Sequence, residues 1–377
     1  MFVAKIKRDD ILAATCILVL VGILTAGLWP FHAPRNRVFW RKDGLFIDHR
    51  GTALSARGFM PSTQPDDTGR TIEAWFQPTR TDQSGTILAF YSPREPQQFS
   101  LYQSHAGLAL RTELASAVEP FQASRLAFLP CIFQGRPELF ITIASGRRGT
   151  AVYVDGSMVQ LFPYFRPGGR AFIGRLVIGT SPVEDDSWSG VWRGLAIYDR
   201  ELTAAAILDH YESWTVKGRP DIRPDERSSA VYLFNEHSGN ILHNAIHSSS
   251  GIDLMIPGRY MLLDEKFLEP VWKEFRWRWS YGKSALINVC GFIPLGFFFA
   301  CLFARRTESP ALPTIVLGAT VSLTIEVLQS FLPTRDSGTT DLITNTLGTG
   351  LGVMLYCWKP LWIAKTLDRL AFLLGAK

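Results

Sequence analysis

The chain has 377 residues, of which 47% are apolar and 12% aromatic, so it is long enough for a bundle of membrane helices and a large globular domain. The net charge of +5 and the pI near 9.0 would suit nucleic acid, but in a chain with membrane segments a basic excess usually marks orientation. We therefore expect no nucleic-acid partner.

The first predicted element is a transmembrane helix. Ile11–Trp29 is an uncharged run of nineteen residues, and three basic residues, Lys5, Lys7 and Arg8, precede it. A cleaved signal peptide is the alternative, but its apolar core would be shorter and a small-residue cleavage site would follow. Here the run ends at Trp29 and Pro30, so we expect an uncleaved helix.

From Arg37 to Gly258 the pattern changes to short alternating segments broken by Gly, Pro, Asp and Ser, which is typical of an all-β domain. The dipeptide Asp155-Gly156 between two such segments predicts a hairpin, because its turn needs positive φ. Only Leu202–Trp214 is predicted to be helical, with Thr203 as its N-cap. Strands are expected at Thr71–Phe76, Thr86–Tyr91, Phe99–Gln103, Ala151–Val154, Ser157–Leu161, Phe172–Gly179, Trp192–Tyr198 and Ala230–Phe234.

Several phrases of this region follow one another in a familiar order. They are Ile72–Trp75, Tyr153–Gly156, Leu176–Gly179, Trp188–Gly190, Leu195–Leu202, Leu233–Gly239 and Asp253–Leu254. In this order they resemble the concanavalin A-like, laminin-G-like (LamG) jelly rolls. The resemblance implies an all-β sandwich, and we expect this sandwich to bind glycan or an envelope partner.

The predicted jelly roll offers weak candidates for a glycan site. Enzymatic relatives of this fold place carboxylates alternately along one strand, as Glu-x-Asp-x-Glu, and this chain has no such strand. The contiguous Glu184–Asp186 is expected to be a solvated loop, with a calcium or sugar contact as the alternative. Trp188 and Trp192 are candidates for stacking on a sugar ring, although a role in the core is the commoner one for tryptophan.

The cysteines and histidines suggest no metal site and no cofactor. Four of the five cysteines lie in apolar runs, which leaves Cys131 alone in the predicted jelly roll. A single cysteine cannot form an internal disulfide. No Cys-x-x-Cys pair, metal-ligand spacing or catalytic triad involves the histidines, so we assign them no role.

Met261–Lys283 interleaves aromatic and basic residues, a pattern that suits the boundary between lipid and water. We interpret it as an anchoring belt, and capture of anionic lipid phosphates is the alternative. Pro360–Leu374 places Lys365, Asp368 and Arg369 on one face of an otherwise apolar helix, so we expect an interfacial helix there.

Three further apolar runs are each close to the length of a membrane span: Ala285–Phe303, Leu312–Leu332 and Leu342–Trp358. Basic residues flank them at Arg305 and Arg306 and again after Lys359. The positive-inside rule then places both chain ends and the Arg305 loop in the cytoplasm. Residues 30–284 and the turn at Pro333 are predicted to lie outside, so the prediction is four spans in an inner membrane.

Polar residues gather on both sides of the turn that follows Leu332. Glu326 and Gln329 share one helix face, and Asp341 and Asn345 share another. Because carboxylates inside a membrane usually have partners, we expect Arg335 in the turn to meet one of them. The cluster is either a structural clamp between two helices or a ligand site, and the sequence leaves both open.

These polar residues also carry a family resemblance. The matching positions are Asn288, Phe292–Gly296, Ile325–Glu326, Gln329, Pro333, Arg335, Asp341 and Asn345–Gly348. Over about residues 283–357 the chain resembles the VanZ-like family of bacterial membrane proteins. Ser284 departs from the pattern, because much of the family carries an Asp there. The resemblance implies a membrane protein linked to glycopeptide resistance without a settled activity.

The predicted fold class is a multidomain membrane protein: an all-β jelly-roll sandwich plus an α-helical transmembrane bundle of four helices. The expected domains are an N-terminal helix (1–30), the extracytoplasmic jelly roll (31–258), an interfacial connector (259–284), the VanZ-like helices (285–358) and a cytoplasmic amphipathic tail (359–377).

Two functions follow from this organisation. In the first, the protein is non-enzymatic, its jelly roll binds glycan or an envelope partner, and membrane lipids surround the bundle. In the alternative, it is an enzyme or carrier acting on a lipid-linked envelope precursor, with Glu326 and Asp341 as acid and base and Arg335 holding a phosphate. The candidate binding residues are Asn288, Glu326, Gln329, Arg335, Asp341 and Asn345, with Trp188 and Trp192 for glycan.

Overall fold

The chain forms two compact units in the computed structural model. One is Ala33–Asp264, and the other combines Met1–His32 with Glu265–Lys377. The structure describes residues 8–60, 69–93, 95–112, 126–223, 226–246, 252–264, 267–268, 270–271, 279–335 and 337–358.

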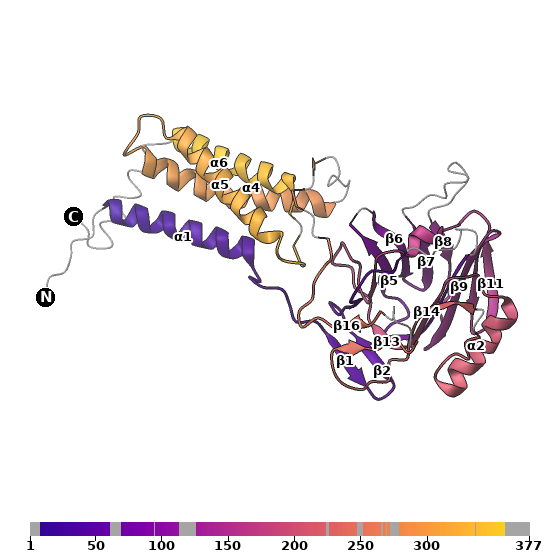
Figure 1. Ribbon diagram of the computed structural model, residues 1–377. Coiled ribbons are helices and arrows are strands. Elements are labelled where there is room, and N and C mark those ends of the chain that lie inside the picture. The colour runs from indigo at the N-terminus through magenta and orange to yellow at the C-terminus, as the bar shows by residue number, and fades with distance from the viewer. Residues whose placement is uncertain are drawn as a thin grey trace. The chain divides into compact units, whose positions relative to one another are not determined.

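The first unit is a β sandwich of two antiparallel sheets (Figure 1). One sheet has the order β1-β2-β13-β4-β9-β10-β11, with β14 also paired to β13, and the other has the order β15-β16-β3-β12-β5-β6-β7-β8. The strands are β1 Val38–Arg41, β2 Gly44–Ile47, β3 Ala53–Ser55, β4 Arg70–Pro78, β5 Ser84–Ser92, β6 Glu95–Ser104, β7 Gly107–Arg111, β8 Leu126–Leu129, β9 Leu139–Gly146, β10 Gly149–Val154, β11 Ser157–Phe162, β12 Arg175–Ile178, β13 Gly190–Tyr198, β14 Ser228–Tyr232, β15 Ile241–Leu242 and β16 Leu254–Met255.

Side-chain alternation along β4 explains how one sheet serves two layers. Ile72, Ala74 and Phe76 point into the main core between the sheets. Trp75 points the other way and packs against a second cluster under helix α2 (Ala204–Lys217). Because successive residues of a strand face opposite sides, a single strand feeds both layers. Glu73, also on the outer side, is fully buried there.

The local signals of the sequence are confirmed in this unit. Each expected strand overlaps an observed one, and Asp155 and Gly156 turn between β10 and β11 with φ of 51° and 76°. The Thr203 side chain caps α2 by accepting a hydrogen bond from the Ala206 main-chain N. Gly218, in the left-handed region, ends the same helix.

The compact β unit extends beyond the predicted end at residue 258. Tyr260 is fully buried, and its hydroxyl lies 2.9 Å from the Thr180 hydroxyl. Three residues later, the Leu263 carbonyl accepts a hydrogen bond from Tyr91. Residues 259–264 are therefore part of the compact β unit.

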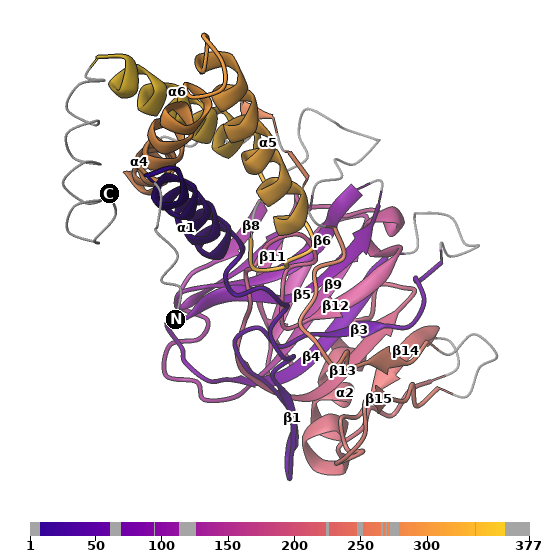
Figure 2. The same cartoon turned by 90° about the vertical axis from the view of Figure 1, so that its left-hand side faces the viewer.

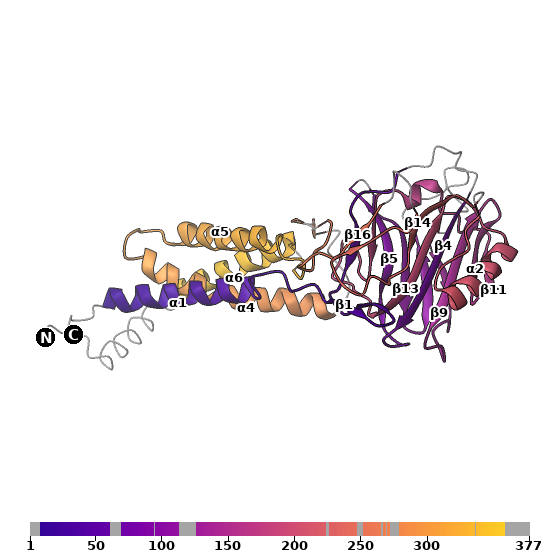
Figure 3. The ribbon, with the colours of Figure 1, turned by 60° about the horizontal axis from the view of Figure 1, so that its bottom comes forward.

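The second unit contains four described helices: α1 Arg8–Leu28, α4 Trp279–Phe303, α5 Ala311–Gln329 and α6 Thr339–Trp358. They lie side by side, with α1 against α4 and α5, and α6 against α4 and α5 (Figures 2 and 3). An ion pair between Asp9 and Arg305 joins the start of α1 to the end of α4. The opposite ends of α1 and α5 are joined through Arg335 and the Trp29 carbonyl.

Three of these helices are long and apolar enough to cross a membrane: Asp9–Leu28, Tyr281–Phe303 and Ala311–Gln329. Among the described residues, α6 is not one of these helices. The first turns of α6 carry Thr339, Thr340, Asp341 and Asn345, which lowers its apolar character. The prediction of apolar helices is thus confirmed for three, while crossing by α6 stays a prediction.

Glycines bring α4 and α6 into close contact. A Cβ on Gly348 would lie 2.2 Å from the Val289 carbonyl oxygen, and one on Gly352 would lie 2.2 Å from the Ile293 carbonyl oxygen. On α4, a Cβ on Gly296 would meet the Thr349 carbonyl at 2.0 Å. Small residues at such positions let helix backbones approach closely, as is common in membrane bundles.

Two predicted segments lie wholly or largely outside the described residues. They are the amphipathic tail, 359–377, and most of the aromatic and basic belt between 265 and 278.

Candidate functional site

The polar residues of the helical unit join its helices near one end of the bundle. Gln329 of α5 donates its Nε2 to the Gly27 carbonyl of α1 at 2.7 Å. Asn288 of α4 donates to Asp341 of α6 at 2.8 Å, and Asn345 of α6 donates to Ser322 of α5 at 3.0 Å. Each of these bonds links a different pair of helices.

Glu326 lies in the same region and is 1% exposed. Its Oε2 accepts a 2.9 Å hydrogen bond from the main-chain N of Gly338, just before α6. As the spacing predicts, Glu326 and Gln329 share the buried face of α5. The carboxylate thereby ties the end of α5 to the start of α6.

Arg335 differs from the prediction. It is exposed, and its Nε and Nη2 donate to the Trp29 carbonyl at 3.1 and 2.7 Å. In the described part of the chain it forms no ion pair with Glu326 or Asp341. The last carbonyls of a helix have no partner within that helix, and α1 presents such a carbonyl to the guanidinium. The sequence indicates only that Arg335 is near the acidic residues around its turn. Its observed partner, the Trp29 carbonyl, lies 306 residues away along the chain.

The helical cluster leaves two acceptors unused. The side-chain oxygens of Gln329 and Asn345 are buried without a hydrogen-bond partner among the described residues. A carboxamide oxygen accepts hydrogen bonds only, so these positions suit a hydroxyl or ammonium donor. The other contacts of the cluster are those of a clamp between helices.

The sandwich contains a buried row of hydrogen-bonded, ionisable side chains that the sequence did not indicate. His210 of α2 is 1% exposed, and its Nδ1 lies 2.8 Å from Glu73 Oε1 while its Nε2 lies 3.1 Å from Glu226 Oε2. Glu73 Oε2 also accepts from Tyr198 and from Trp214. Residues from β4, α2 and the segment before β14 thus meet in one buried network.

The network favours the protonated form of His210. Burial alone would lower the pKa of the imidazole, but the hydrogen bond and charge of Glu73, together with Glu226, outweigh it and raise the pKa above its ordinary value of 6.5. Each ring nitrogen lies within hydrogen-bond distance of a carboxylate, an arrangement that suits an imidazolium, which donates from both nitrogens. No sequence spacing signals this arrangement, because its members lie far apart along the chain.

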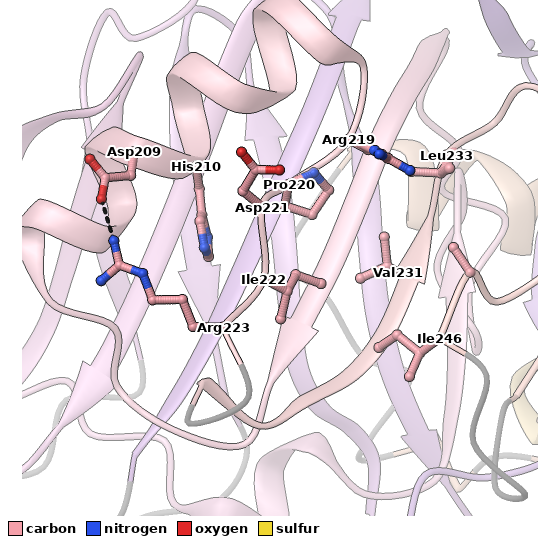
Figure 4. Close-up of a pocket in the computed structure, with 11 residues that line it drawn as sticks. Asp209, His210, Arg219, Pro220, Asp221, Ile222, Arg223, Val231, Leu233 and Ile246 are labelled. Carbon is pink, nitrogen blue, oxygen red and sulfur yellow. Dashed lines mark hydrogen bonds and ion pairs between the residues drawn. The ribbon is translucent and has the colours of Figure 1, made fainter.

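A groove of about 710 Å³ lies beside this network, between α2, the loop after it and β14 (Figure 4). We call it the α2 groove. Its lining is Asp209, His210, Arg219, Pro220, Asp221, Ile222, Arg223, Val231, Leu233, Ala245 and Ile246. Its volume falls within the range of about 300–1,000 Å³ that is usual for small-ligand sites.

The predicted glycan tryptophans lie elsewhere. Trp188 and Trp192 are both fully buried in the main core, with ring centroids 6.1 Å apart. A ring enclosed on all sides cannot lie on a sugar, so the stacking interpretation does not hold for either residue. Trp188 Nε1 donates to Gln103 at 2.7 Å, which satisfies its polar atom inside the core.

Two carboxylates of the acidic loop at 184–186 have partners within the sandwich. Asp185 pairs with Arg50 at 2.9 Å, and Asp186 accepts from the Thr86 hydroxyl at 3.2 Å. Burial raises the pKa of the Asp186 carboxyl, and the Thr86 bond offsets part of that effect. Among the described residues, no three His, Cys, Asp or Glu side chains are grouped so as to hold a metal ion.

Comparison with family models matches both parts of the chain. Residues 58–208 match a laminin-G model of the concanavalin A-like lectin/glucanases superfamily, and residues 230–362 match the VanZ/LLP1 model. The chain combines a VanZ-like region with a LamG-like β sandwich. Both resemblances stated from the sequence are confirmed, and the VanZ-like match together with three apolar helices fits a membrane-associated protein.

The chain is also similar to solved structures. A pentraxin of the serum amyloid P type from Limulus polyphemus is 18% identical with a TM-score of 0.32, covering 57% of this chain and 100% of its own. A protein from Bacteroides ovatus is 10% identical with a TM-score of 0.37, covering 61% of this chain and 62% of its own. At these scores neither likeness says what this chain binds. A comparison with curated proteins found no match.

Proposed function

We propose that this chain is a non-enzymatic binding protein of the bacterial cell envelope, whose helices anchor it in the inner membrane and whose sandwich binds glycan, or an envelope partner, on the extracytoplasmic side. The observation that carries the proposal is the order of the parts. A complete β sandwich, Ala33–Asp264, is inserted between two apolar helices, α1 and α4. The superfamily of the sandwich includes lectins, which supports glycan as the ligand class.

The ends of the helices support this orientation. Arg8, Arg305 and Arg306 lie at one end of the bundle, where Asp9 pairs with Arg305. The sandwich is connected to the C-terminal end of α1 and to the N-terminal end of α4, which both lie at the opposite end of the bundle. Because basic residues stay preferentially on the cytoplasmic side, the sandwich is assigned to the outside. Four spans with both termini inside follow if α6 also crosses.

The state of the acidic residues supports binding over catalysis. In the sandwich, Glu73 and Glu226 are buried and bonded to His210, so neither faces a substrate. In the bundle, Glu326 accepts from Gly338 and Asp341 accepts from Asn288. A general base must reach the proton that it removes. These carboxylates are engaged in holding elements together.

Asn288, Glu326, Gln329, Arg335, Asp341 and Asn345 therefore remain proposed as a polar site of the membrane unit, with the clamp role preferred. Membrane lipids around the bundle are the proposed partners of the helical unit as a whole.

Glycan binding is testable with the full-length protein in nanodiscs, immobilised and exposed to soluble fragments of bacterial cell-wall glycan. We expect saturable binding that a protein reduced to the helical unit lacks. Binding by both proteins alike would place the ligand on the bundle. Absence of binding by the full-length protein would contradict the proposal.

A further inference from the structure

The loop that forms one wall of the α2 groove is built to hold its shape. Gly218 ends α2 with φ of 69°, and the Ser213 hydroxyl donates to the Arg219 carbonyl at 2.7 Å. At the other end of the loop, the Arg223 main-chain N donates to Glu226 Oε2 at 2.7 Å. Because Glu226 is itself bonded to His210, the loop is tied to the helix at both ends.

Among the described residues, ion pairs around the groove involve both of its aspartates but not Arg219. Asp209 pairs with Arg223 at 2.8 Å, and Asp221 pairs with Lys217. Arg219 is exposed, lines the groove, and forms no ion pair with any described residue. Its guanidinium is therefore available to a ligand, and this planar fork fits a carboxylate in bidentate fashion.

The apolar part of the groove is aliphatic. Ile222, Leu233 and Ile246 are each half-buried, packing against the cluster under α2 while showing part of their surface to the groove. The described lining contains no Trp, Tyr or Phe on which the flat face of a sugar could lie. The groove therefore places an aliphatic wall beside Arg219. A ligand that carries a small apolar side chain next to an anionic group would complement both features.

We propose that the α2 groove binds a short peptide with aliphatic side chains through its free C-terminal carboxylate, which Arg219 holds. The aliphatic side chain lies against Ile222, Leu233 and Ile246. Capture of a terminal carboxylate is a common mode of peptide recognition, and the carboxylate distinguishes a chain end from internal sequence. This peptide binding does not depend on the proposed glycan binding, because the ligand of the groove is not a sugar and the membrane helices do not line it.

The test uses the full-length protein in nanodiscs and acetyl-Ala-Val with a free carboxylate, with binding measured by calorimetry. The same peptide as its C-terminal amide should bind at least about tenfold more weakly, a difference of about 1.4 kcal/mol. Arg219→Ala should remove this preference, and Arg219→Lys should keep part of it, because lysine retains the charge without the fork. Arg136→Ala, a change of another exposed arginine outside the groove lining, should leave binding unchanged.

Galacturonic acid separates the two ligand classes, because it carries a carboxylate on a sugar ring. Tighter binding of galacturonic acid than of the peptide acid, dependent on Arg219, would overturn the proposal and make the groove a glycan site. Equal affinity for the peptide acid and its amide would also overturn it. An Arg219→Ala variant that melts like the unchanged protein shows that a lost preference reflects the missing cation.

Discussion

At the scale of single residues, the buried network of Glu73, His210 and Glu226 makes the stability of the β sandwich depend on pH. The pKa of His210 is raised in the folded state, so the folded protein binds more protons than the unfolded one. Its contribution is full below about pH 6.5, the pKa in the unfolded chain, and is lost as pH rises through the higher folded pKa. Residues 33–264 should therefore melt at lower temperature as pH increases across that window.

The matched variant is His210→Gln, which cannot carry the charge. We expect it to melt lower at pH 6 and to show a flatter pH dependence than the unchanged domain, measured by circular dichroism. The slope for one group cannot exceed about 1.4 kcal/mol per pH unit. A domain that instead gains stability as pH rises from 6 to 9 would show that His210 is neutral when folded.

Glu326 and Arg335 should act independently. The sequence suggested a charge pair, which would make Glu326→Gln rescue Arg335→Ala, but the two side chains bond to Gly338 and Trp29 respectively. Each single change removes or weakens a separate contact of about 1 kcal/mol. Melting of the full-length protein in detergent should give effects that add to within about 0.5 kcal/mol. Rescue in the double variant would restore the charge-pair interpretation.

Residues with local signals could be predicted, whereas those defined by distant partners could not. Thr203, Asp155 and Gly156 act on their own neighbours, and the structure has them as predicted. Trp188 and His210 depend on residues remote in sequence: Trp188 bonds to Gln103, and His210 bonds to Glu73 and Glu226. No spacing along the chain encodes such contacts, so the sequence left two roles open for Trp188 and indicated none for His210.

At the scale of elements, the contact between α4 and α6 depends on glycine. Gly348→Ala places a Cβ against the Val289 carbonyl, a backbone atom that cannot turn aside. We expect a loss of about 1–3 kcal/mol, measured as thermal melting in detergent. Gly350 on the same helix is the control, since a Cβ there meets nothing within 4 Å. Equal effects at both positions would contradict the close packing of these helices.

The end of the sandwich is a second prediction at this scale. Residues 33–264 should fold cooperatively, while residues 33–258 should be less stable because they lack the buried Tyr260. Loss of a buried aromatic side chain costs about 3–5 kcal/mol. Denaturant unfolding of both proteins measures the difference. Tyr260→Phe within 33–264 should cost only about 1 kcal/mol, the share of the hydroxyl bond to Thr180. Equal stability of the two lengths would place Tyr260 outside the cooperative unit.

The elements themselves were largely predictable, because alternation and apolar runs are properties of a segment. The end of the sandwich was not, since the aromatic pattern after Met261 is equally typical of a membrane interface. Contacts with residues distant in sequence, among them Thr180 and Tyr91, assign Tyr260 and Leu263 to the β unit. Likewise, the partner of Arg335 lies on α1, far away in sequence.

At the scale of the whole molecule, an exported sandwich requires the two ends of the bundle to lie on opposite sides of a membrane. Arg305 marks the end proposed to be cytoplasmic, and the sandwich attaches at the other. The chain supplies its own probe, because Cys131 is exposed and lies in the sandwich, whereas the remaining cysteines lie on the helices.

The most direct test is labelling of intact spheroplasts with a membrane-impermeant maleimide. Cys131 should react without permeabilisation, and Cys131→Ser should remove that signal. Thr307→Cys in the Cys131→Ser background should react only after the membrane is opened, since residue 307 follows Arg305 in the loop after α4. Protection of Cys131 in intact spheroplasts, with Thr307→Cys labelled from outside, would contradict the proposed exported binding domain.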